Sequence, residues 1–216
     1  PHTRRILMAQ YDVAAEAITI ARPGVDRPRL TPAPTTPPLI LSVGILHPRK
    51  GHDILIDALA MLGDLDWRAV IAGNPWDQKY ELGLRQQIAD SPVASRIHLA
   101  GRVSTDELEQ LYANASIFAL ATRYEGHGIA LDEALIRGLP IISCDTGAVP
   151  DTGPNGAGIL VPPDDPLHFA EALREIISDD AVRRRIATVA LKEGQRLPDW
   201  QHPATVVSGM LGTIEV

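Results

Sequence analysis

From residue 39 onward, short apolar runs alternate with segments in which apolar residues recur every three to four positions. The short runs have the length of buried strands and predict strands at residues 39–43, 67–72, 97–100, 117–121, 140–144 and 158–161. The periodic segments predict helices at residues 53–62, 80–89, from Ser104 onward, at 129–136, and two or three closing helices at 167–177, 181–194 and 203–211. Ser104 and Glu107 have the spacing of a capping box at the start of their helix. Continuous apolar strands that alternate with helices predict an α/β fold, a Rossmann-like doubly wound parallel sheet of about six strands with C-terminal helices.

The first 38 residues follow a different pattern. A short helical pattern at residues 3–7 and a strand pattern at residues 17–21 precede a segment, residues 28–38, that holds five prolines. Proline-rich segments are stiff and extended, so we expect a linker or a surface loop there. Residues 1–27 are then a remnant of an N-terminal domain or the lead into the linker, and residues 39–216 form the Rossmann-like domain. Because the chain opens on proline rather than methionine, we expect it to be part of a longer protein.

Composition narrows the class of protein. Apolar residues make up 45% and charged residues 22%, as in soluble globular proteins. A net charge of −7 argues against nucleic acid as a partner. The single cysteine, Cys144, allows no internal disulfide and favours a reducing, cytoplasmic compartment; its apolar strand predicts an inert buried thiol. No apolar run approaches the roughly 20 residues of a membrane-spanning helix.

Candidate chemistry is concentrated where the strand at 117–121 is followed by a glycine-containing loop and a helix. Gly126 and Gly128 flank His127 at the start of that helix. The first N–H groups of a helix have no intrahelical partner, and the aligned peptide dipoles add partial positive charge. A phosphate fits such a place, and His127 can contact a phosphate or a sugar hydroxyl.

Two glutamates belong to the same stretch, Glu125 in the loop and Glu133 on the helix. A carboxylate accepts hydrogen bonds from two neighbouring hydroxyls, so each can hold a hydroxyl pair of a sugar or a ribose. The alternative is an ordinary glycine turn followed by a solvated glutamate. Strand context, spacing and flanking glycines together favour the ligand site. Asp132 points about 100° away from Glu133 around the helix, and we expect it to be a solvated charge.

Earlier loops supply further candidates. Gly44, Gly73 and Gly101 end predicted strands, and the carboxyl ends of parallel strands meet at one edge of a sheet, where ligands bind. Lys50 follows the first glycine and places an ammonium beside a diphosphate, or it is an exposed loop cation.

Asn74, after the second glycine, either hydrogen-bonds a ligand or forms an Asx turn. Arg102 and Val103, after the third, border a slot for a base. The spacing of the histidines matches no metal-ligand pattern, so no metal is expected.

With these residues placed, the chain resembles the C-terminal, donor-binding domain of a retaining glycosyltransferase with the GT-B fold, family 4, or glycosyl transferases group 1. The resemblance covers nearly everything from Ile18 onward. Several segments carry it, beginning with the Pro-Gly-Val-Asp turn at 23–26. Residues 44–51 are similar to the family pattern G-R-L-x-x-x-K-G, and residues 125–133 are similar to its pattern E-x7-E. Residues 147–151 and 158–163 also resemble the family.

The resemblance implies that residues 39–216 bind a nucleotide diphosphate sugar, with UDP, GDP or ADP as the nucleotide. It implies transfer of a hexosyl group to an acceptor hydroxyl with retention, without a metal or another cofactor. Lys50 would hold the diphosphate, Glu125 the donor-sugar hydroxyls near the reacting carbon, and Glu133 the ribose hydroxyls. The remaining donor contacts that it implies are Gly44, Gly73, Asn74, Arg102, Val103, Gly126, His127, Gly128, Ile129 and Ala130.

By the same resemblance, the N-terminal domain of the full-length protein supplies the acceptor site. We therefore expect this chain to bind a nucleotide diphosphate weakly and not to transfer sugar by itself. The implied roles are glycan, lipid or polysaccharide biosynthesis in the cytoplasm, with peripheral association of the full-length protein with the inner membrane face as an option.

Three positions depart from the family pattern. Ile45 stands where the family has arginine, His127 where it often has an aromatic residue, and Thr146 where it has the first of two glycines. The first departure implies either weaker diphosphate stabilisation or a substitute cation, Arg49. A nucleotide-sugar epimerase or phosphorylase of related fold and a non-catalytic nucleotide-sugar-binding module are the alternatives, which an assay of the full-length protein separates.

Overall fold

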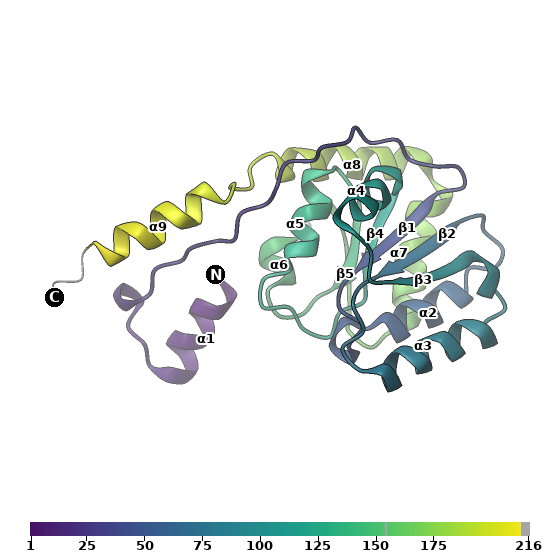
Figure 1. Cartoon of the computed structure of the whole chain (residues 1–216), viewed down its shortest axis with the longest axis horizontal. Coiled ribbons are helices and arrows are strands. Elements are labelled where there is room, and N and C mark those ends of the chain that lie inside the picture. The colour runs from purple at the N-terminus through teal and green to yellow at the C-terminus, as the bar shows by residue number, and fades with distance from the viewer. Residues whose placement is uncertain (154, 213–216) are drawn as a thin grey trace.

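The computed structural model describes residues 1–153 and 155–212 and contains a six-stranded sheet in which neighbouring strands are parallel (Figure 1). The strands are β1 (Leu39–Val43), β2 (Arg68–Ala72), β3 (Ile97–Gly101), β4 (Ile117–Leu120), β5 (Ile141–Cys144) and β6 (Gly158–Val161). Their order is β3-β2-β1-β4-β5-β6, the doubly wound order that reverses direction between β1 and β4. The predicted fold and all its strands are confirmed, and the strand ends differ from the prediction by one residue at most.

One helix precedes the sheet, and the others fill the connections between strands or follow the sheet. They are α1 (His2–Tyr11), α2 (His52–Ala60), α3 (Gln78–Asp90), α4 (Thr105–Asn114), α5 (Ile129–Ile136), α6 (Val149–Thr152), α7 (Pro166–Ser178), α8 (Asp180–Gly194) and α9 (Gln201–Leu211). The predicted capping box is confirmed, since Ser104 and Glu107 exchange hydrogen bonds at the start of α4. Sequence periodicity missed α6, because one turn is too short to show a helical repeat. Within the described residues, none of these helices is long and apolar enough to cross a membrane.

Two apolar layers hold the sheet between them. On one face, α2, α3 and α7 pack around Trp67 and Phe169, both fully buried. On the other face, α4 and α5 pack around Tyr112 and Phe118, and α8 lies against α5. Each buried Val, Leu, Ile or Phe side chain contributes about 1.5–3 kcal/mol, so these layers fix the loops at the sheet edge firmly.

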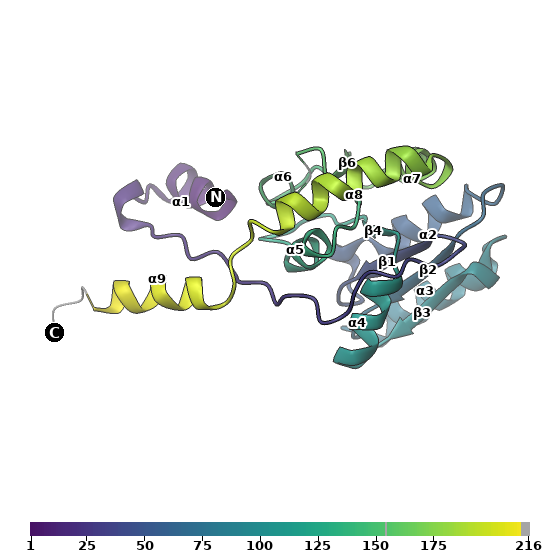
Figure 2. The ribbon, with the colours of Figure 1, turned by 90° about the horizontal axis from the view of Figure 1, so that it is seen from above.

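The N-terminal arm, residues 1–27, lies outside the sheet and projects on the same side of the molecule as α9 (Figures 1 and 2). The strand predicted at residues 17–21 is wrong: Ala15–Ala17 form a 3-10 turn, and residues 18–21 have no regular structure. The reason is that a strand needs a partner for its N–H and C=O groups, and the sheet in the described chain ends at β3 and β6.

The proline-rich segment, residues 28–38, follows the surface of the domain. The Ala33 N–H donates to Ala113 O at 2.7 Å, and the Thr35 N–H donates to Asn114 O at 3.1 Å, at the end of α4. The segment is thus docked along its path to β1. The division of the chain into domains stays a prediction, and residues 154 and 213–216 of the predicted domain lie outside the described residues.

Candidate functional site

The loops that follow β1, β2 and β3 lie against one another at the carboxyl edge of the sheet. The Gly73 N–H donates to Gly101 O at 2.8 Å, and the Leu46 N–H donates to Asn74 O at 2.8 Å. A Cβ on Gly73 would lie 1.8 Å from Gly44 O, so this approach requires glycine. The predicted convergence of the glycine-containing loops is confirmed.

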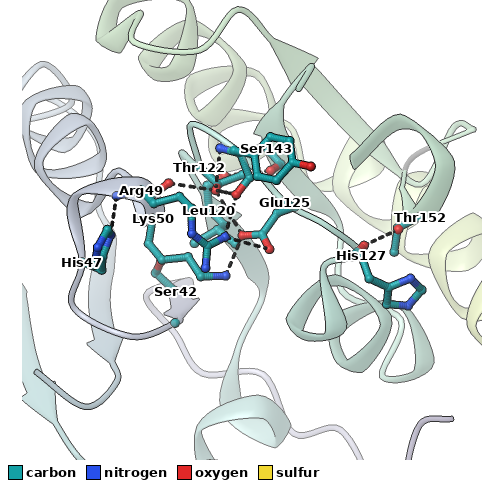
Figure 3. A network of polar contacts seen from close by, with 12 residues as sticks. Ser42, His47, Arg49, Lys50, Leu120, Thr122, Glu125, His127, Ser143 and Thr152 are labelled. Atoms are coloured by element: carbon teal, nitrogen blue, oxygen red, sulfur yellow. Dashed lines mark hydrogen bonds and ion pairs between the residues drawn. The ribbon is translucent and has the colours of Figure 1, made fainter. Parts of the chain in front are cut away.

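Lys50 and Glu125 meet across this edge, although 75 residues separate them. The Lys50 Nζ lies 2.5 Å from Glu125 Oε1, and the two side chains are only 13% and 6% exposed. The hydroxyl of Thr122 lies 3.1 Å from the same oxygen, and Arg49 Nη1 lies 3.7 Å from Glu125 Oε2 (Figure 3). Each oxygen of the carboxylate therefore has a cation beside it.

The two loops are fastened to each other by their backbones. The Arg123 N–H donates to Arg49 O at 2.8 Å. Gly51 follows Lys50 with φ +63, and a Cβ there would lie 1.9 Å from Ala121 O. This contact places Lys50 at the point where the sheet reverses direction, between β1 and β4.

A buried histidine supports the base of the Lys50 loop. His52 is fully buried; its Nε2 lies 3.3 Å from Gly44 O and its Nδ1 lies 3.5 Å from Ser42 Oγ. Burial lowers the pKa of His52 from 6.5 to about 4. The ring is therefore neutral at neutral pH and links β1 to the loop that begins at Gly44.

The loop before α5 presents backbone donors. Gly128 adopts φ +88, and a Cβ on Gly126 would meet nothing within 4 Å. The loop accepts hydrogen bonds through Glu125 O and His127 O, and the N–H groups of residues 126–130 have no acceptor in the described part of the chain. Open space, free N–H groups and the start of a helix together suit an anion.

Asp132 is buried, which corrects its prediction as a solvated charge. It is 3% exposed, and its Oδ2 lies 2.7 Å from His127 Nε2. The loop folds back over the first turn of α5, so the side chain that points away from Glu133 faces the loop rather than water. The hydroxyl of Thr152 donates to His127 O and anchors the loop from α6 (Figure 3).

Glu133 has partners of its own. The Tyr112 hydroxyl donates to Glu133 Oε2 at 2.9 Å, and Arg137 donates to Glu133 O at 3.0 Å. The Arg137 guanidinium lies 4.4 Å from the Tyr112 ring centroid and pairs with Glu109. Burial raises the pKa of Glu133, against the opposing effects of Tyr112 and Arg137, and burial raises the pKa of Tyr112 well above its ordinary value. The carboxylate is thus half-buried, with one oxygen already occupied.

The predicted site residues that remain are Asn74, Arg102 and Val103. Arg102 and Asn74 are exposed, and Val103 lines a hollow of about 460 Å³ between β3 and α4. Their roles toward a ligand stay predictions. In residues 1–153 and 155–212, no group of three or more His, Cys, Asp or Glu side chains could hold a metal ion.

Sequence reasoning missed Thr122 and Tyr112. Thr122 had a signal, since it is a polar residue at the end of an apolar strand run. Tyr112 had none, because an aromatic residue on the buried side of a helix is an ordinary core residue.

Comparisons with known proteins identify the family of the chain. The family model for glycosyl transferases group 1 matches residues 27–193. A D-inositol 3-phosphate glycosyltransferase from a Nocardioides species is 29% identical over 92% of this chain and 49% of its own length. A GDP-mannose-dependent alpha-(1-6)-phosphatidylinositol monomannoside mannosyltransferase from Mycobacterium tuberculosis is 30% identical over 82% of this chain and 51% of its own length. The chain spans about half the length of these curated relatives.

Solved structures show the same fold. A glycosyltransferase from Rickettsia africae superposes with a TM-score of 0.84 at 20% identity, over 97% of this chain and 60% of that chain. Anabaena HepE in complex with UDP and glucose superposes with a TM-score of 0.75 at 24% identity, over 82% of this chain and 48% of that chain. With a family match over most of its length and a sheet that is one half of a GT-B fold, the chain belongs to the group 1 glycosyltransferases.

Proposed function

We propose that this chain is the donor-binding half of a retaining glycosyltransferase, which transfers a hexosyl group from a nucleotide diphosphate sugar to an acceptor hydroxyl. The observation that carries the proposal is the contact of Lys50 with Glu125 beside the open loop at the start of α5. The ammonium of Lys50, the free N–H groups and the dipole at the start of α5 suit a diphosphate. The carboxylate of Glu125 beside them suits the hydroxyls of a sugar.

In the reaction, the bond between the anomeric carbon and the diphosphate oxygen breaks, and the acceptor oxygen bonds to that carbon on the same face. The proton of the acceptor hydroxyl passes to the departing diphosphate. Negative charge grows on the leaving diphosphate, where Lys50 and the N–H groups of residues 126–130 stabilise it. Without donor, Glu125 neutralises Lys50 at 2.5 Å. Arrival of the diphosphate draws Lys50 away and frees Glu125 Oε1 for the sugar, so one exchange of partners prepares both groups.

Arg49 is the proposed replacement for the arginine that the family has at Ile45. Its Nη1 lies 3.7 Å from Glu125 Oε2 and donates to Tyr124 O at 2.8 Å, so the guanidinium is at the site. Ile45 is 36% exposed and brings no charge. The cation is thus supplied from another position of the same loop.

The acceptor site belongs, in this proposal, to an N-terminal domain of the full-length protein. Exposed apolar side chains on the two projecting helices support it: Met8 and Tyr11 on α1, and Val207 and Leu211 on α9. Apolar patches that are contiguous mark protein contacts, and both helices project on the same side of the molecule. A cytoplasmic location and peripheral membrane association stay predictions.

The direct test is calorimetric titration of the chain with UDP, GDP and ADP. We expect one of them to bind, and Lys50→Ala and Glu133→Ala to weaken that binding by about tenfold or more, as loss of a charged hydrogen bond does. Lys79→Ala is the matched control, because Lys79 is an exposed lysine at the start of α3. Binding that is absent, or equal in all variants, would contradict the proposal.

Two alternatives are separated by the full-length protein. A nucleotide-sugar epimerase or phosphorylase acts without an acceptor alcohol, whereas a non-catalytic module binds donor and never transfers it. Ile45 favours the second alternative, and the position of Arg49 at the site counts against it.

A further inference from the structure

A second cavity lies between the N-terminal arm and the loop at the start of α5. Its volume is about 280 Å³. Among the residues that line it are His2, Arg4 and Arg22 of the arm and Gly126, His127 and Thr152 of the domain. The cavity therefore borders the proposed donor loop but is closed on its other side by a different part of the chain.

Unsatisfied polar atoms are concentrated here. In the described residues, four buried side-chain nitrogen or oxygen atoms lack a hydrogen-bond partner: Nε of Arg4 and of Arg22, Nε2 of His2, and Oδ1 of Asp132. The first three belong to walls of the cavity, and the fourth belongs to the carboxylate that holds His127. Buried polar atoms are nearly always paired, so this cluster of unpaired atoms distinguishes the surroundings of the cavity from the rest of the described chain.

The charge of the walls is positive. Arg22 forms no hydrogen bond or ion pair with any described residue, and Arg4 donates only to Ala15 O, at 3.3 Å, within the described chain. Asp151 also lines the cavity, but it pairs with Arg5 at 2.8 Å. Two arginines without an ion-pair partner in the described chain thus line a small hollow, and a guanidinium binds the oxygens of a phosphate or carboxylate in parallel pairs.

We propose that this cavity binds an anionic group of the acceptor, a phosphomonoester or comparable oxyanion, through Arg4 and Arg22. The inference rests on the proposed function, and Arg4 and Arg22 belong to residues 1–27, the segment predicted to be a remnant of the N-terminal domain or the lead into the linker. Lys50 is not among the residues that line the cavity, so the donor diphosphate and this anion use different cations. Because the walls include Gly126 and His127, an acceptor anchored by its anion presents its hydroxyl to a sugar held at the donor loop. The acceptor class is therefore an alcohol that carries a phosphate or a comparable oxyanion.

Inorganic phosphate is the probe, titrated calorimetrically at constant ionic strength with and without saturating UDP. We expect phosphate to bind in both conditions, and Arg22→Gln and Arg4→Gln each to weaken it by about tenfold, since each removes a charged donor. Arg185→Gln, a change at an exposed arginine of α8, should leave phosphate affinity unchanged. The UDP affinity of all three variants is measured as well, and an unchanged value shows that the donor site and the fold are intact.

Three results would overturn the inference: no phosphate binding, equal binding by Arg22→Gln and Arg185→Gln, or displacement of phosphate by UDP, which would assign the cavity to the donor. Failure of UDP to bind at all is a separate outcome. It contradicts the proposed function, while the response of phosphate binding to Arg22→Gln still decides whether the cavity is an anion site.

Discussion

Replacing Lys50 with methionine removes the ammonium 2.5 Å from Glu125 Oε1 and keeps a side chain of similar length. Loss of one partner from a buried ion pair costs about 3–5 kcal/mol of unfolding free energy, because the remaining charge stays desolvated. Here we expect about 2–3 kcal/mol, since Glu125 keeps the Thr122 hydroxyl at 3.1 Å and Arg49 at 3.7 Å. Lys50→Met combined with Glu125→Gln has neither charge, so the pair should show a coupling energy of about 2 kcal/mol.

The assay is urea unfolding of the wild type, both single variants and the double variant, followed by far-UV circular dichroism and by tryptophan fluorescence, to which the buried Trp67 contributes. A control cycle uses Arg174→Met and Asp64→Asn, a surface pair at 2.6 Å whose side chains are 42% and 62% exposed. Water screens that pair, so its coupling should be much smaller. The reasoning that burial makes this contact strong would be refuted by a Lys50–Glu125 coupling energy that is no larger than the coupling energy of the control pair.

The remaining predictions concern three other contacts. Tyr112→Phe removes the donor to Glu133 Oε2 and should weaken UDP binding about five- to tenfold, but leave 2′,3′-dideoxy-UDP binding unchanged, because only the ribose diol needs the positioned carboxylate. Burial lowers the pKa of His52 to about 4, so between pH 6.5 and 4 the unfolded chain binds a proton that the folded chain does not. Acidification from pH 7 to 4.5 should thus cost about 2–3 kcal/mol at this residue, and His52→Gln should lose less. Gly73→Ala forces a Cβ to 1.8 Å from a carbonyl oxygen and should cost about 3 kcal/mol or more, whereas Gly83→Ala, in open space on α3, should stabilise by about 0.5–1 kcal/mol.

Controls make these outcomes decisive. Tyr11→Phe, at a 69% exposed position, should change neither nucleotide affinity. Equal losses for UDP and its dideoxy form in Tyr112→Phe would show that Tyr112 has no ribose-specific role. Identical urea midpoints against pH for wild type and His52→Gln would exclude His52 as a source of acid sensitivity. A Gly73→Ala variant as stable as wild type would contradict the close loop approach.

The sheet was predictable because its signal is local. Strands buried on both faces are continuous apolar runs, and glycines at their ends mark the loops. The same kind of signal failed at residues 17–21, where Ala-Ile-Thr-Ile-Ala has strand composition but no neighbouring strand in the described chain. Strand propensity states what suits a sheet, and pairing depends on where the segment lies.

The site was predictable in its parts and not in its connections. Lys50 and Glu125 were identified from their loops, but their direct contact depends on the distance between β1 and β4. Asp132 has an ordinary position on a helix, and only the fold of the preceding loop buries it. The bond of Tyr112 to Glu133 joins two helices, so no pattern within one segment reveals it.

The reversal between β1 and β4 has a mechanical consequence. The loop that carries Lys50 leads into α2, which packs with α7 on one face of the sheet. The loop that carries Glu125 leads into α5, which packs against α8 on the other face. A slight slide of one layer past the other changes the spacing of the two charges, even when no residue at the edge is altered. Substitutions in the core, far from Lys50 and Glu125, should therefore change donor affinity. Donor affinity then reports how the two helix layers of the domain are aligned.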